Sequence, residues 1–160
     1  MSLTVSRAGR LHCSGMAEIL NAIIEQGETT ALATPVTGND LAERMTRERA
    51  AWHVAEDDAG LVLGFQWIEP ADYLPAEAAE IATFARIGMT GLGIGSALFR
   101  ATEQVARDLG FGWINANIRA DNTGGLAYYQ SRGFEDYGRI DGYRMANGKT
   151  VDKILKRFEL

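Results

Sequence analysis

Three glycines at alternate positions of residues 91–95 separate a strand-like segment from a helical one. Residues 80–87 are rich in Ile, Thr, Phe and Ala, and residues 93–109 repeat apolar side chains at the helical period. A further strand-like run follows at residues 113–119. Strand–helix–strand connections of this kind are right-handed and place the two strands parallel in one sheet. The segment therefore predicts one crossover unit to which the other elements must be added.

The rest of the chain predicts a mixed α+β domain. No repeat, low-complexity tract or linker divides the sequence, so residues 1–160 are expected to form a single domain. The further strands are expected at residues 3–7, 52–56 and 61–69 and as a pair within 135–160, and the further helices at 14–27, 39–51 and 122–133. Asn147-Gly148 is typical of a type I′ hairpin turn between the last two strands.

Composition excludes several classes of function. The 160 residues carry a formal net charge of −5, which argues against non-specific nucleic-acid binding. No apolar run is long enough for a membrane helix, and the N-terminus lacks the pattern of a secretory signal. The single cysteine and the two histidines predict neither a disulfide nor a metal site. We therefore expect a cytoplasmic protein without a bound metal.

Charge is distributed unevenly along the chain. Residues 1–80 carry 5 basic and 13 acidic groups, a net charge of −8, whereas residues 81–160 carry 11 basic and 8 acidic groups, a net charge of +3. This pattern is consistent either with solvated faces or with an anionic ligand held by the C-terminal half.

The glycine cluster suits a phosphate ligand. Backbone N–H groups at a helix start are unsatisfied, the helix dipole adds positive charge there, and glycine permits close approach. A dinucleotide fingerprint would need a third glycine where Ser96 stands, and a P-loop would need lysine where Ile94 stands. Both nucleotide motifs are therefore excluded, whereas a tight turn without a ligand stays open.

Two motifs in order resemble the GNAT superfamily of N-acetyltransferases. Thr90-Gly91-Leu92-Gly93-Ile94-Gly95 resembles the motif Gln/Arg-x-x-Gly-x-Gly/Ala, with Thr90 in place of the first Gln or Arg. Residues 122–134 resemble the second signature, Asn-x-x-Ala-x-x-x-Tyr-x-x-x-Gly-Phe, with Gly125 in place of Ala. The order of the predicted elements also resembles this superfamily over nearly the whole chain. The resemblance implies a mostly antiparallel sheet with a splayed parallel strand pair, flanked by helices.

The resemblance further implies that acetyl-CoA is the acetyl donor. Its pyrophosphate would lie on the glycine loop, and its pantetheine arm would pair with the exposed backbone of Phe84 and Arg86 in the strand before that loop. Tyr129 would face the thioester sulfur. The implied contacts are Phe84, Ala85, Arg86, Thr90, Gly91, Leu92, Gly93, Ile94, Gly95, Ser96, Asn117, Asn122 and Tyr129. Tyr129 is thus the candidate for stabilising or protonating the leaving thiolate, and Asn122 is also a candidate helix N-cap.

The acceptor side resembles the phosphinothricin acetyltransferase-like branch of the superfamily. In that branch a glutamate at the position of Glu80 is thought to deprotonate the amine, and Glu28, in the loop after the first helix, is a rival base bordering the acceptor pocket. Arg144 and Lys153 would hold the carboxylate of an amino-acid-like acceptor. For each of these charged residues a solvated surface role is the alternative interpretation.

Three functions remain open from the sequence. The leading one is acetyl transfer to the primary amine of a small molecule, and the alternatives are acetylation of protein N-termini and CoA binding without catalysis. Relatives in this branch are often dimers, so the resemblance also implies a homodimer.

Overall fold

The computed structural model describes residues 2–89 and 91–160. In chain order the elements are β1 (Thr4–Arg7), a 3₁₀ turn (Arg10–His12), α1 (Cys13–Gln26), α2 (Gly38–Arg44), β2 (Ala51–Glu56), β3 (Val62–Glu69), β4 (Ala78–Ala85), α3 (Ile94–Asp108), β5 (Trp113–Arg119), α4 (Thr123–Ser131), β6 (Glu135–Arg144) and β7 (Thr150–Glu159). This order of helices and strands confirms the predicted α+β arrangement.

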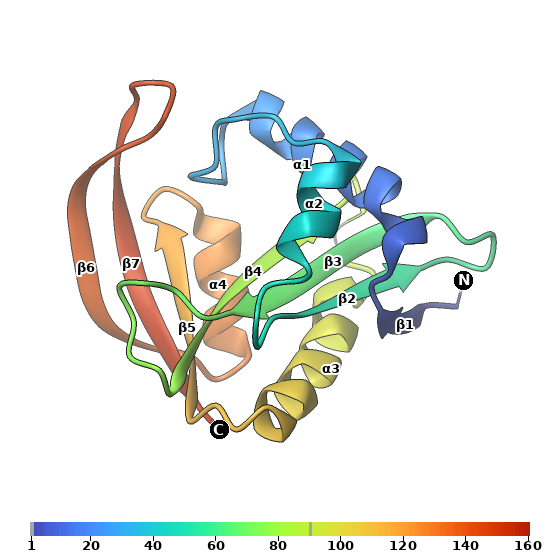
Figure 1. The fold of residues 1–160 in the computed structure, drawn as a ribbon. Helices are drawn as coiled ribbons and strands as arrows, with labels where there is room; N and C mark the ends of the chain where they lie inside the picture. The colour runs from blue at the N-terminus through green and yellow to red at the C-terminus, as the bar shows by residue number, and fades with distance from the viewer. Residues whose placement is uncertain (1, 90) are drawn as a thin grey trace.

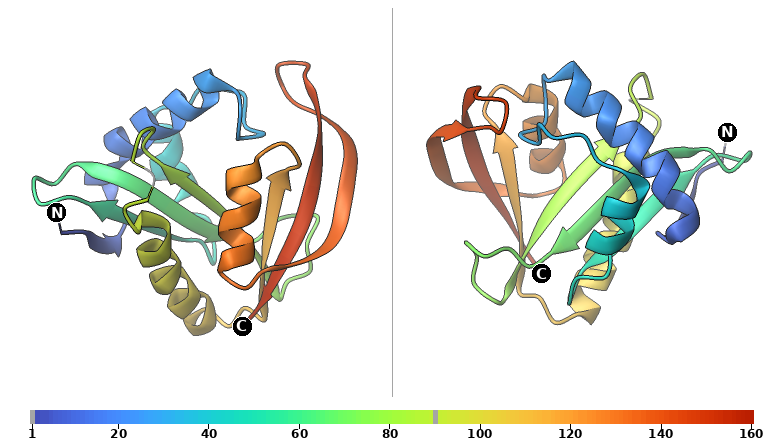
Figure 2. Two further views of the ribbon diagram at one scale, coloured as in Figure 1. Left: turned by 180° about the vertical axis from the view of Figure 1, so that it is seen from behind. Right: turned by 45° about the horizontal axis from the view of Figure 1, so that its top comes forward.

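The strands form one seven-stranded sheet in the order β1-β2-β3-β4-β5-β7-β6. All neighbouring strands are antiparallel except β4 and β5, which are the parallel pair expected from the crossover through α3. Figure 1 shows α1 and α2 on one face of the sheet, and the view from behind in Figure 2 shows α3 and α4 on the other. The sheet therefore divides two helical layers.

Buried clusters on both faces of the sheet fix these layers. On one face, α1 places Met16, Leu20 and Ile23 against stacked aromatic side chains of β2, β3 and β4, among them Trp52 and Trp67, whose ring centroids lie 4.4 Å apart. On the other face, Phe99, Ile114, Phe134 and their neighbours join α3 and α4 to the sheet. Burial of this apolar area is what holds the sheet between the helices.

The parallel pair β4–β5 separates along its length, and this separation positions the site. The two strands are paired only from Ala78↔Trp113 to Ile81↔Ala116. Beyond this point β4 continues to Ala85 and β5 to Arg119 without pairing to each other. On their outer sides the strands keep partners over these lengths, β3 for β4 and β7 for β5. The splayed pair that the superfamily resemblance implied is therefore confirmed.

Several boundaries differ from the sequence predictions. The first helix begins at Cys13 rather than at residue 14, because a 3₁₀ turn precedes it directly. The second helix is capped by Thr37, whose side chain accepts from the Asp40 N–H, and it ends at Arg44. The chain between there and β2 forms successive turns, and Arg49 has a φ of 61°.

The predicted type I′ turn is wrong. That turn needs positive φ at both central residues, and only Gly148, with a φ of 87°, has one there. Instead Gly148 N–H donates to the Met145 carbonyl at 2.9 Å, and Met145 N–H donates to the Lys149 carbonyl at 2.8 Å. The hairpin thus closes through a longer loop with a single left-handed glycine.

None of the helices within residues 2–89 and 91–160 combines the length and apolarity required to cross a bilayer.

Candidate active site

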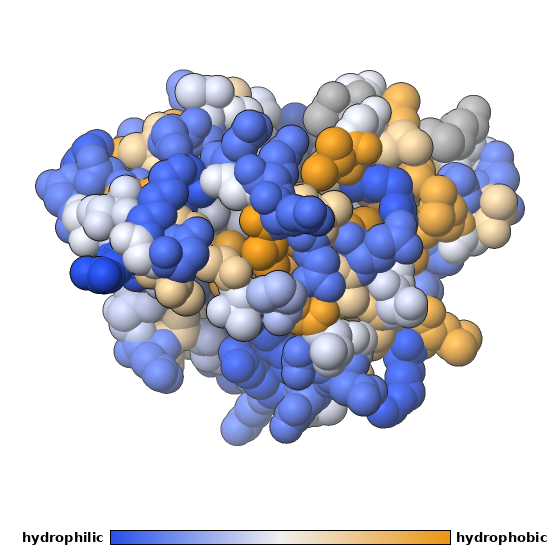
Figure 3. All heavy atoms as spheres, turned by 90° about the horizontal axis from the view of Figure 1, so that it is seen from above, coloured by the Kyte–Doolittle hydropathy of each residue, from blue (hydrophilic) through white to orange (hydrophobic). Residues whose placement is uncertain are grey.

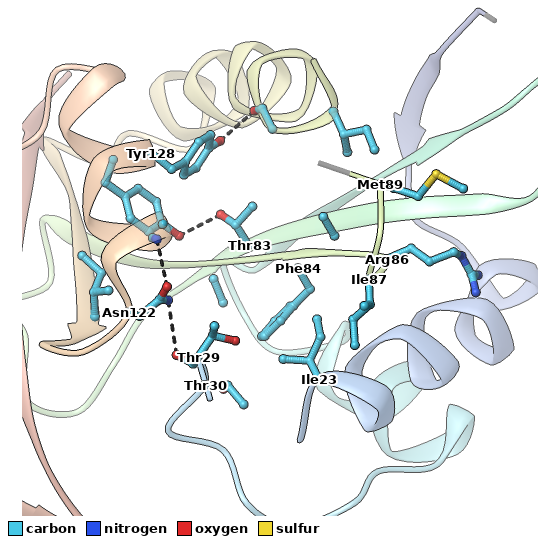
Figure 4. Close-up of a pocket in the computed structure, with 18 of the residues that line it drawn as sticks. Ile23, Thr29, Thr30, Thr83, Phe84, Arg86, Ile87, Met89, Asn122 and Tyr128 are labelled. Carbon is cyan, nitrogen blue, oxygen red and sulfur yellow. Dashed lines mark hydrogen bonds between the residues drawn. The ribbon is translucent and has the colours of Figure 1, made fainter. Parts of the chain in front are cut away.

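The principal cavity lies where β4 and β5 separate, and its volume is about 740 Å³. It is bordered by the C-terminal halves of both strands, the start of α3, the face of α4 and the loop that follows α1. Figure 4 shows Thr83 and Phe84 of β4 at its centre, Tyr128 on one side and Ile23 and Thr30 on the other. A cavity between splayed strands offers main-chain hydrogen bonds to an extended ligand.

The start of α3 forms the phosphate-binding end of this cavity. Gly91 and Gly93 have φ values of 81° and 76°, and a Cβ built on either would meet no atom within 4 Å. Gly93 is the N-cap and offers no side chain, so the first N–H groups of α3 have no side-chain partner among residues 2–89 and 91–160. Gly91, Gly93, Ile94, Gly95 and Ser96 all line the cavity. This end can therefore hold an anion.

Two other members of the predicted loop are placed differently. Leu92 does not line the cavity and is 44% exposed. Thr90, at the position where the motif carries Gln or Arg, lies outside the residues that the structure describes.

Arg132 was missed by the sequence analysis. It follows α4, and its Nη1 donates to Ser96 Oγ at 2.7 Å across the mouth of the anion site. Its Nε is buried and has no hydrogen-bond partner among the described residues. The charged guanidinium beside a helix N-terminus is suited to a phosphate group. Its position inside the second signature, just before Gly133, was the available signal.

The main-chain groups of Phe84 and Arg86 on β4 point in a different direction from the one that the sequence predicted. Arg86 N–H donates to the Leu63 carbonyl of β3 at 2.8 Å, and the Arg86 carbonyl accepts from Met89 N–H at 3.0 Å. Because main-chain groups of alternate residues point to the same edge of a strand, Phe84 also faces β3. The expectation that Phe84 and Arg86 present their backbones to the ligand is therefore wrong, and Thr83 and Ala85 face the splay instead.

The side chains of these residues still shape the cavity. Phe84 lines it and packs against Phe65 with ring centroids 5.1 Å apart. The Arg86 guanidinium is used structurally, since its Nε and Nη2 donate to the Val62 carbonyl and its Nη1 pairs with Glu18.

Tyr129 lies where the second signature predicts, on α4 facing the cavity. Its hydroxyl is 2.7 Å from Thr83 Oγ1 of β4, and the residue is only 6% exposed. Burial, the largest cause, raises the pKa of Tyr129, so the phenol keeps its proton at neutral pH. Its neighbour Tyr128 donates to the Gly95 carbonyl at 2.7 Å and so ties α4 to the start of α3.

Asn122 caps α4 as predicted. Its Oδ1 accepts from Gly125 N–H at 2.9 Å, and its Nδ2 donates to the Thr29 carbonyl at 3.3 Å. An added Cβ at residue 125 would lie 2.5 Å from Asn122 Nδ2, so the departure from alanine at that position makes room for this side chain. Asn122 also lines the cavity.

Glu80 lies on the α1 side of the same strand pair, in register with Asn115. Tyr73 donates a hydrogen bond to its Oε1, and Asn115 Nδ2 approaches the same oxygen at 3.5 Å. Burial, the largest cause, raises the pKa of Glu80. Oε2 has no hydrogen-bond partner within residues 2–89 and 91–160, so it is available to accept a proton.

Tyr73 connects Glu80 to the cavity and was not predicted. Asn117, which lines the cavity, donates from Nδ2 to the Tyr73 hydroxyl at 3.0 Å. Asn117 Oδ1 is buried and makes no hydrogen bond to the described residues. Tyr73 belongs to the loop between β3 and β4, where no sequence period marks it. An unpaired acceptor therefore lies between the cavity and the carboxylate.

The three predicted acceptor residues are not equivalent. Lys153 of β7 is buried, and its Nζ lies 3.5 Å from the centroid of the Tyr143 ring. Desolvation lowers the pKa of Lys153, and the charge of Glu80 opposes this effect. Arg144 and Glu28 are exposed, and neither lines the principal cavity. The structure thus brings Lys153 near Glu80 and leaves the other two at the surface.

No group of three or more His, Cys, Asp or Glu side chains in the described part of the chain is arranged to hold a metal ion.

On the face where α1 lies, apolar side chains reach the surface. Figure 3 shows them between hydrophilic ones.

Comparison with known proteins assigns the family. The sequence profile of the Acetyltransferase (GNAT) family matches residues 17–134. Since this match covers most of the chain, the protein belongs to that family and is an acetyltransferase.

Several relatives match along most or all of their length. YwnH of Bacillus subtilis strain 168, provisionally named a phosphinothricin acetyltransferase, is 29% identical over 160 residues, which cover 97% of this chain and 98% of that protein. A crystal structure provisionally named a phosphinothricin N-acetyltransferase is also 29% identical, covers 99% of both chains and has a TM-score of 0.85. The Sinorhizobium meliloti phosphinothricin acetyltransferase, solved with acetyl-CoA, is 24% identical, with 100% of this chain and 89% of that chain covered and a TM-score of 0.88.

Proposed function

We propose that this protein transfers the acetyl group of acetyl-CoA to the primary amine of a small amino-acid-like molecule by direct attack. The observation that carries the proposal is one cavity with free N–H donors of α3 at one end and the Tyr129 hydroxyl on its wall. Acetyl-CoA bound in the Sinorhizobium meliloti relative and the names of the other relatives agree with it.

The donor would lie extended between β4 and β5. Its diphosphate would accept from the N–H groups at the start of α3 and from Arg132, which lies beside Ser96. The main-chain groups of Thr83 and Ala85 face the splay and would pair with the amides of the pantetheine arm. One of these N–H groups would also stabilise the oxyanion of the tetrahedral intermediate.

The amine must first lose a proton. An alkylamine with a pKa near 10.4 is costly to present uncharged at pH 7, by about 4–5 kcal/mol. Glu80 would accept this proton on Oε2, with Tyr73 and Asn115 holding Oε1. Its raised pKa makes it a stronger base than an exposed glutamate. Asn117, which lines the cavity, would hold the Tyr73 hydroxyl in place beside Glu80.

The transfer then balances as follows. The neutral nitrogen bonds to the thioester carbon, and the carbon–sulfur bond breaks. Tyr129 donates a hydrogen bond to the sulfur as negative charge develops there. A second proton leaves the nitrogen as the amide forms, and this balances the proton that the thiolate takes up in becoming the free thiol of CoA.

Acceptor recognition rests on Lys153 in this proposal. It is a buried cation without an ion pair to any described side chain, and it is close enough to Glu80 for the two charges to interact. A carboxylate on the acceptor would neutralise it while the amine approaches Glu80. Arg144 and Glu28, both exposed, would contact only the outer part of the acceptor.

The test is a substrate screen. Acetyl-CoA would be incubated with amino acids, their sulfoximine and phosphinyl analogues, polyamines and short peptides, with thiol release and product mass as readouts. We expect turnover with an amino-acid analogue and little with its decarboxylated amine. Turnover with peptides alone would indicate an N-terminal acetyltransferase, and CoA binding without turnover of any amine would indicate a non-catalytic CoA-binding module.

A further inference from the structure

A buried chain of hydrogen bonds runs beside the cavity and ends at Tyr129. Gln66 of β3, fully buried, donates from Nε2 to Thr83 Oγ1 at 2.9 Å and to the Tyr128 hydroxyl at 3.2 Å. Tyr128 continues to the Gly95 carbonyl, and Thr83 to the Tyr129 hydroxyl, both at 2.7 Å. Figure 4 shows these last two bonds as dashed lines on the cavity side of α4, one from Tyr128 to the start of α3 and one at Thr83. The chain therefore joins β3, β4, α4 and the start of α3.

The direction of the first two bonds follows from donor and acceptor chemistry. The Gly95 carbonyl can only accept, so Tyr128 gives its one proton to it. Tyr128 must then receive a hydrogen bond on its second contact, which requires the nitrogen rather than the oxygen of the Gln66 amide. The reversed amide would bury two N–H groups without acceptors, whereas the observed one leaves only Oε1 unpaired among the described residues.

The direction of the remaining bond, between Thr83 and Tyr129, follows from the same argument. Because the Gln66 amide nitrogen donates to Thr83 Oγ1, the hydroxyl proton of Thr83 must go elsewhere. Tyr129 Oη, 2.7 Å away, is the acceptor for it, since the neighbouring Tyr128 oxygen already receives from Gln66. If Tyr129 donated instead, the Thr83 proton would have no acceptor among the described side chains and would point into the cavity, against the pantetheine arm of a bound donor, which is unfavourable.

We propose that Gln66 acts as a positioning residue for acetyl transfer: through Thr83 it makes Tyr129 an acceptor and so leaves the Tyr129 O–H free to donate into the cavity. This inference rests on the proposed function, because the group receiving that bond is the sulfur of CoA. When the carbon–sulfur bond breaks, the thiolate accepts from Tyr129, while the Thr83 O–H supports the phenol oxygen.

The sequence context agrees with a special role for Gln66. It is a lone amide within β3, whose eight residues are all buried. Burying an amide is costly unless its hydrogen bonds are made, so an apolar residue would pack there at lower cost. The two hydrogen bonds that the amide donates, to Thr83 and Tyr128, explain why a polar residue is present at this buried position.

The first experiment measures kcat and KM for Thr83→Val, Thr83→Ser and Gln66→Met. Valine replaces the hydroxyl by a methyl group, serine keeps the hydroxyl, and methionine keeps the length of glutamine. We expect kcat to fall about 10- to 100-fold in Thr83→Val and Gln66→Met, with KM for acetyl-CoA changed by less than about 3-fold. Thr83→Ser should restore most of kcat. Thr102→Val, at a buried hydroxyl of α3 that bonds to no described residue, is the matched control and should retain wild-type kcat.

A double substitution separates positioning from general damage. Adding Thr83→Val to Tyr129→Phe should lower kcat no further than Tyr129→Phe alone, because the proton that Thr83 directs is already gone. A multiplicative fall would overturn the proposal, as would Thr83→Ser being as slow as Thr83→Val, or wild-type kcat in both Thr83→Val and Gln66→Met. Each variant is first checked by thermal unfolding, and Gln66→Met serves if Thr83→Val does not fold.

The second readout does not need turnover. A phenol that donates to the bound sulfur stabilises the thiolate, so the pKa of the CoA thiol should be lower in the complex than in solution. The absorbance of the thiolate, titrated with pH in the CoA complex, should show this lowering in wild type and its loss in Thr83→Val and Tyr129→Phe. If wild type acetylates no amine yet shows the lowering, the positioning holds and the proposed reaction fails. If the thiol pKa is the same in all proteins, or wild type does not bind CoA, the positioning inference is overturned.

Discussion

Arg119, at the end of β5, donates from Nη1 to the main-chain carbonyl of Gly27, at the end of α1, with a distance of 3.0 Å. The same atom reaches the Thr30 carbonyl at 3.1 Å, and the residue is only 2% exposed. Asp121 holds the other edge of the guanidinium, with Nη2 2.7 Å from its Oδ2. One buried cation thus fixes the loop that borders the cavity.

Arg119→Met should release this loop. The carbonyls of Gly27 and Thr30 lose their donor, and we expect the free energy of unfolding to fall by about 3 kcal/mol, measured by chemical denaturation. The amides of residues 27–34 should exchange hydrogen faster than those of α3. Arg139→Met is the control, since this guanidinium is half exposed and pairs with the exposed Asp141 and the half-exposed Asp152, so its loss should leave the free energy of unfolding nearly unchanged. Equal exchange in wild type and Arg119→Met would contradict the assignment.

The pH dependence of kcat/KM should report Glu80. Only the carboxylate accepts a proton, so activity falls as pH drops through its pKa, and burial places this limb above the usual value near 4.3. Glu80→Gln should abolish the limb and lower kcat by about 10²-fold or more. Tyr73→Phe removes a donor that stabilises the charged form, so the limb should move to higher pH. If Glu28→Gln removes the limb instead, the base is Glu28.

Two glycines at the ends of α3 allow a matched test of the anion site. Gly93 and Gly110 have φ values of 76° and 83°, and a Cβ at either would meet nothing within 4 Å. Alanine should therefore cost similar backbone strain at both, about 1 kcal/mol of stability. Only Gly93 lines the cavity, so only Gly93→Ala should weaken CoA binding in calorimetry. Equal CoA affinity in the two variants would remove the loop from the binding site.

Arg132 should bind the phosphate groups of the donor. Replacing it by methionine should weaken CoA about 10- to 100-fold, as expected for charge-assisted hydrogen bonds, and reduce the salt dependence of binding. Acetyl-pantetheine, which lacks the diphosphate, should bind both proteins equally. Arg100→Met, on an exposed position of α3, is the control and should bind CoA as wild type does. Equal weakening of both ligands would indicate a structural role for Arg132.

The parts of this structure that periodicity encodes could be predicted. The order of helices and strands, the parallel pair and the glycine turn follow from local patterns, and Tyr129 and Asn122 follow from motif spacing. Helix ends were predicted less well. Thr37 caps α2 through a hydrogen bond with Asp40, but neighbouring residues in the sequence could also serve as caps, so the sequence alone does not select Thr37.

Contacts across the sheet could not be predicted in the same way. Gln66 reaches Thr83, and Arg119 reaches Gly27, only because β3 neighbours β4 and the end of β5 lies beside the end of α1. The main-chain direction of Arg86 depends on strand register, which a one-residue shift would reverse. Such facts arise from pairing between distant segments, and a single sequence contains no direct signal of pairing.

His53 should make the fold sensitive to acid. It is buried in β2, in register with Arg7 and Gln66, and its Nδ1 has no partner among the described residues. Burial, with a smaller contribution from the charge of Arg7, lowers the pKa of His53 to about 4. Below pH 6.5 His53 is protonated in the unfolded chain but stays neutral in the folded chain. Stability that is present above pH 6.5 is therefore lost as pH falls toward 4. The loss should be about 3 kcal/mol.

Chemical denaturation of wild type and His53→Leu between pH 7.5 and about 4 checks this expectation. Other titrating groups are common to both proteins, so their contributions cancel in the difference between the two curves. That difference should change by about 3 kcal/mol over the range, with wild type losing more. Parallel curves would mean that His53 titrates alike in the folded and unfolded chains, and the unpaired Nδ1 would then have no energetic consequence.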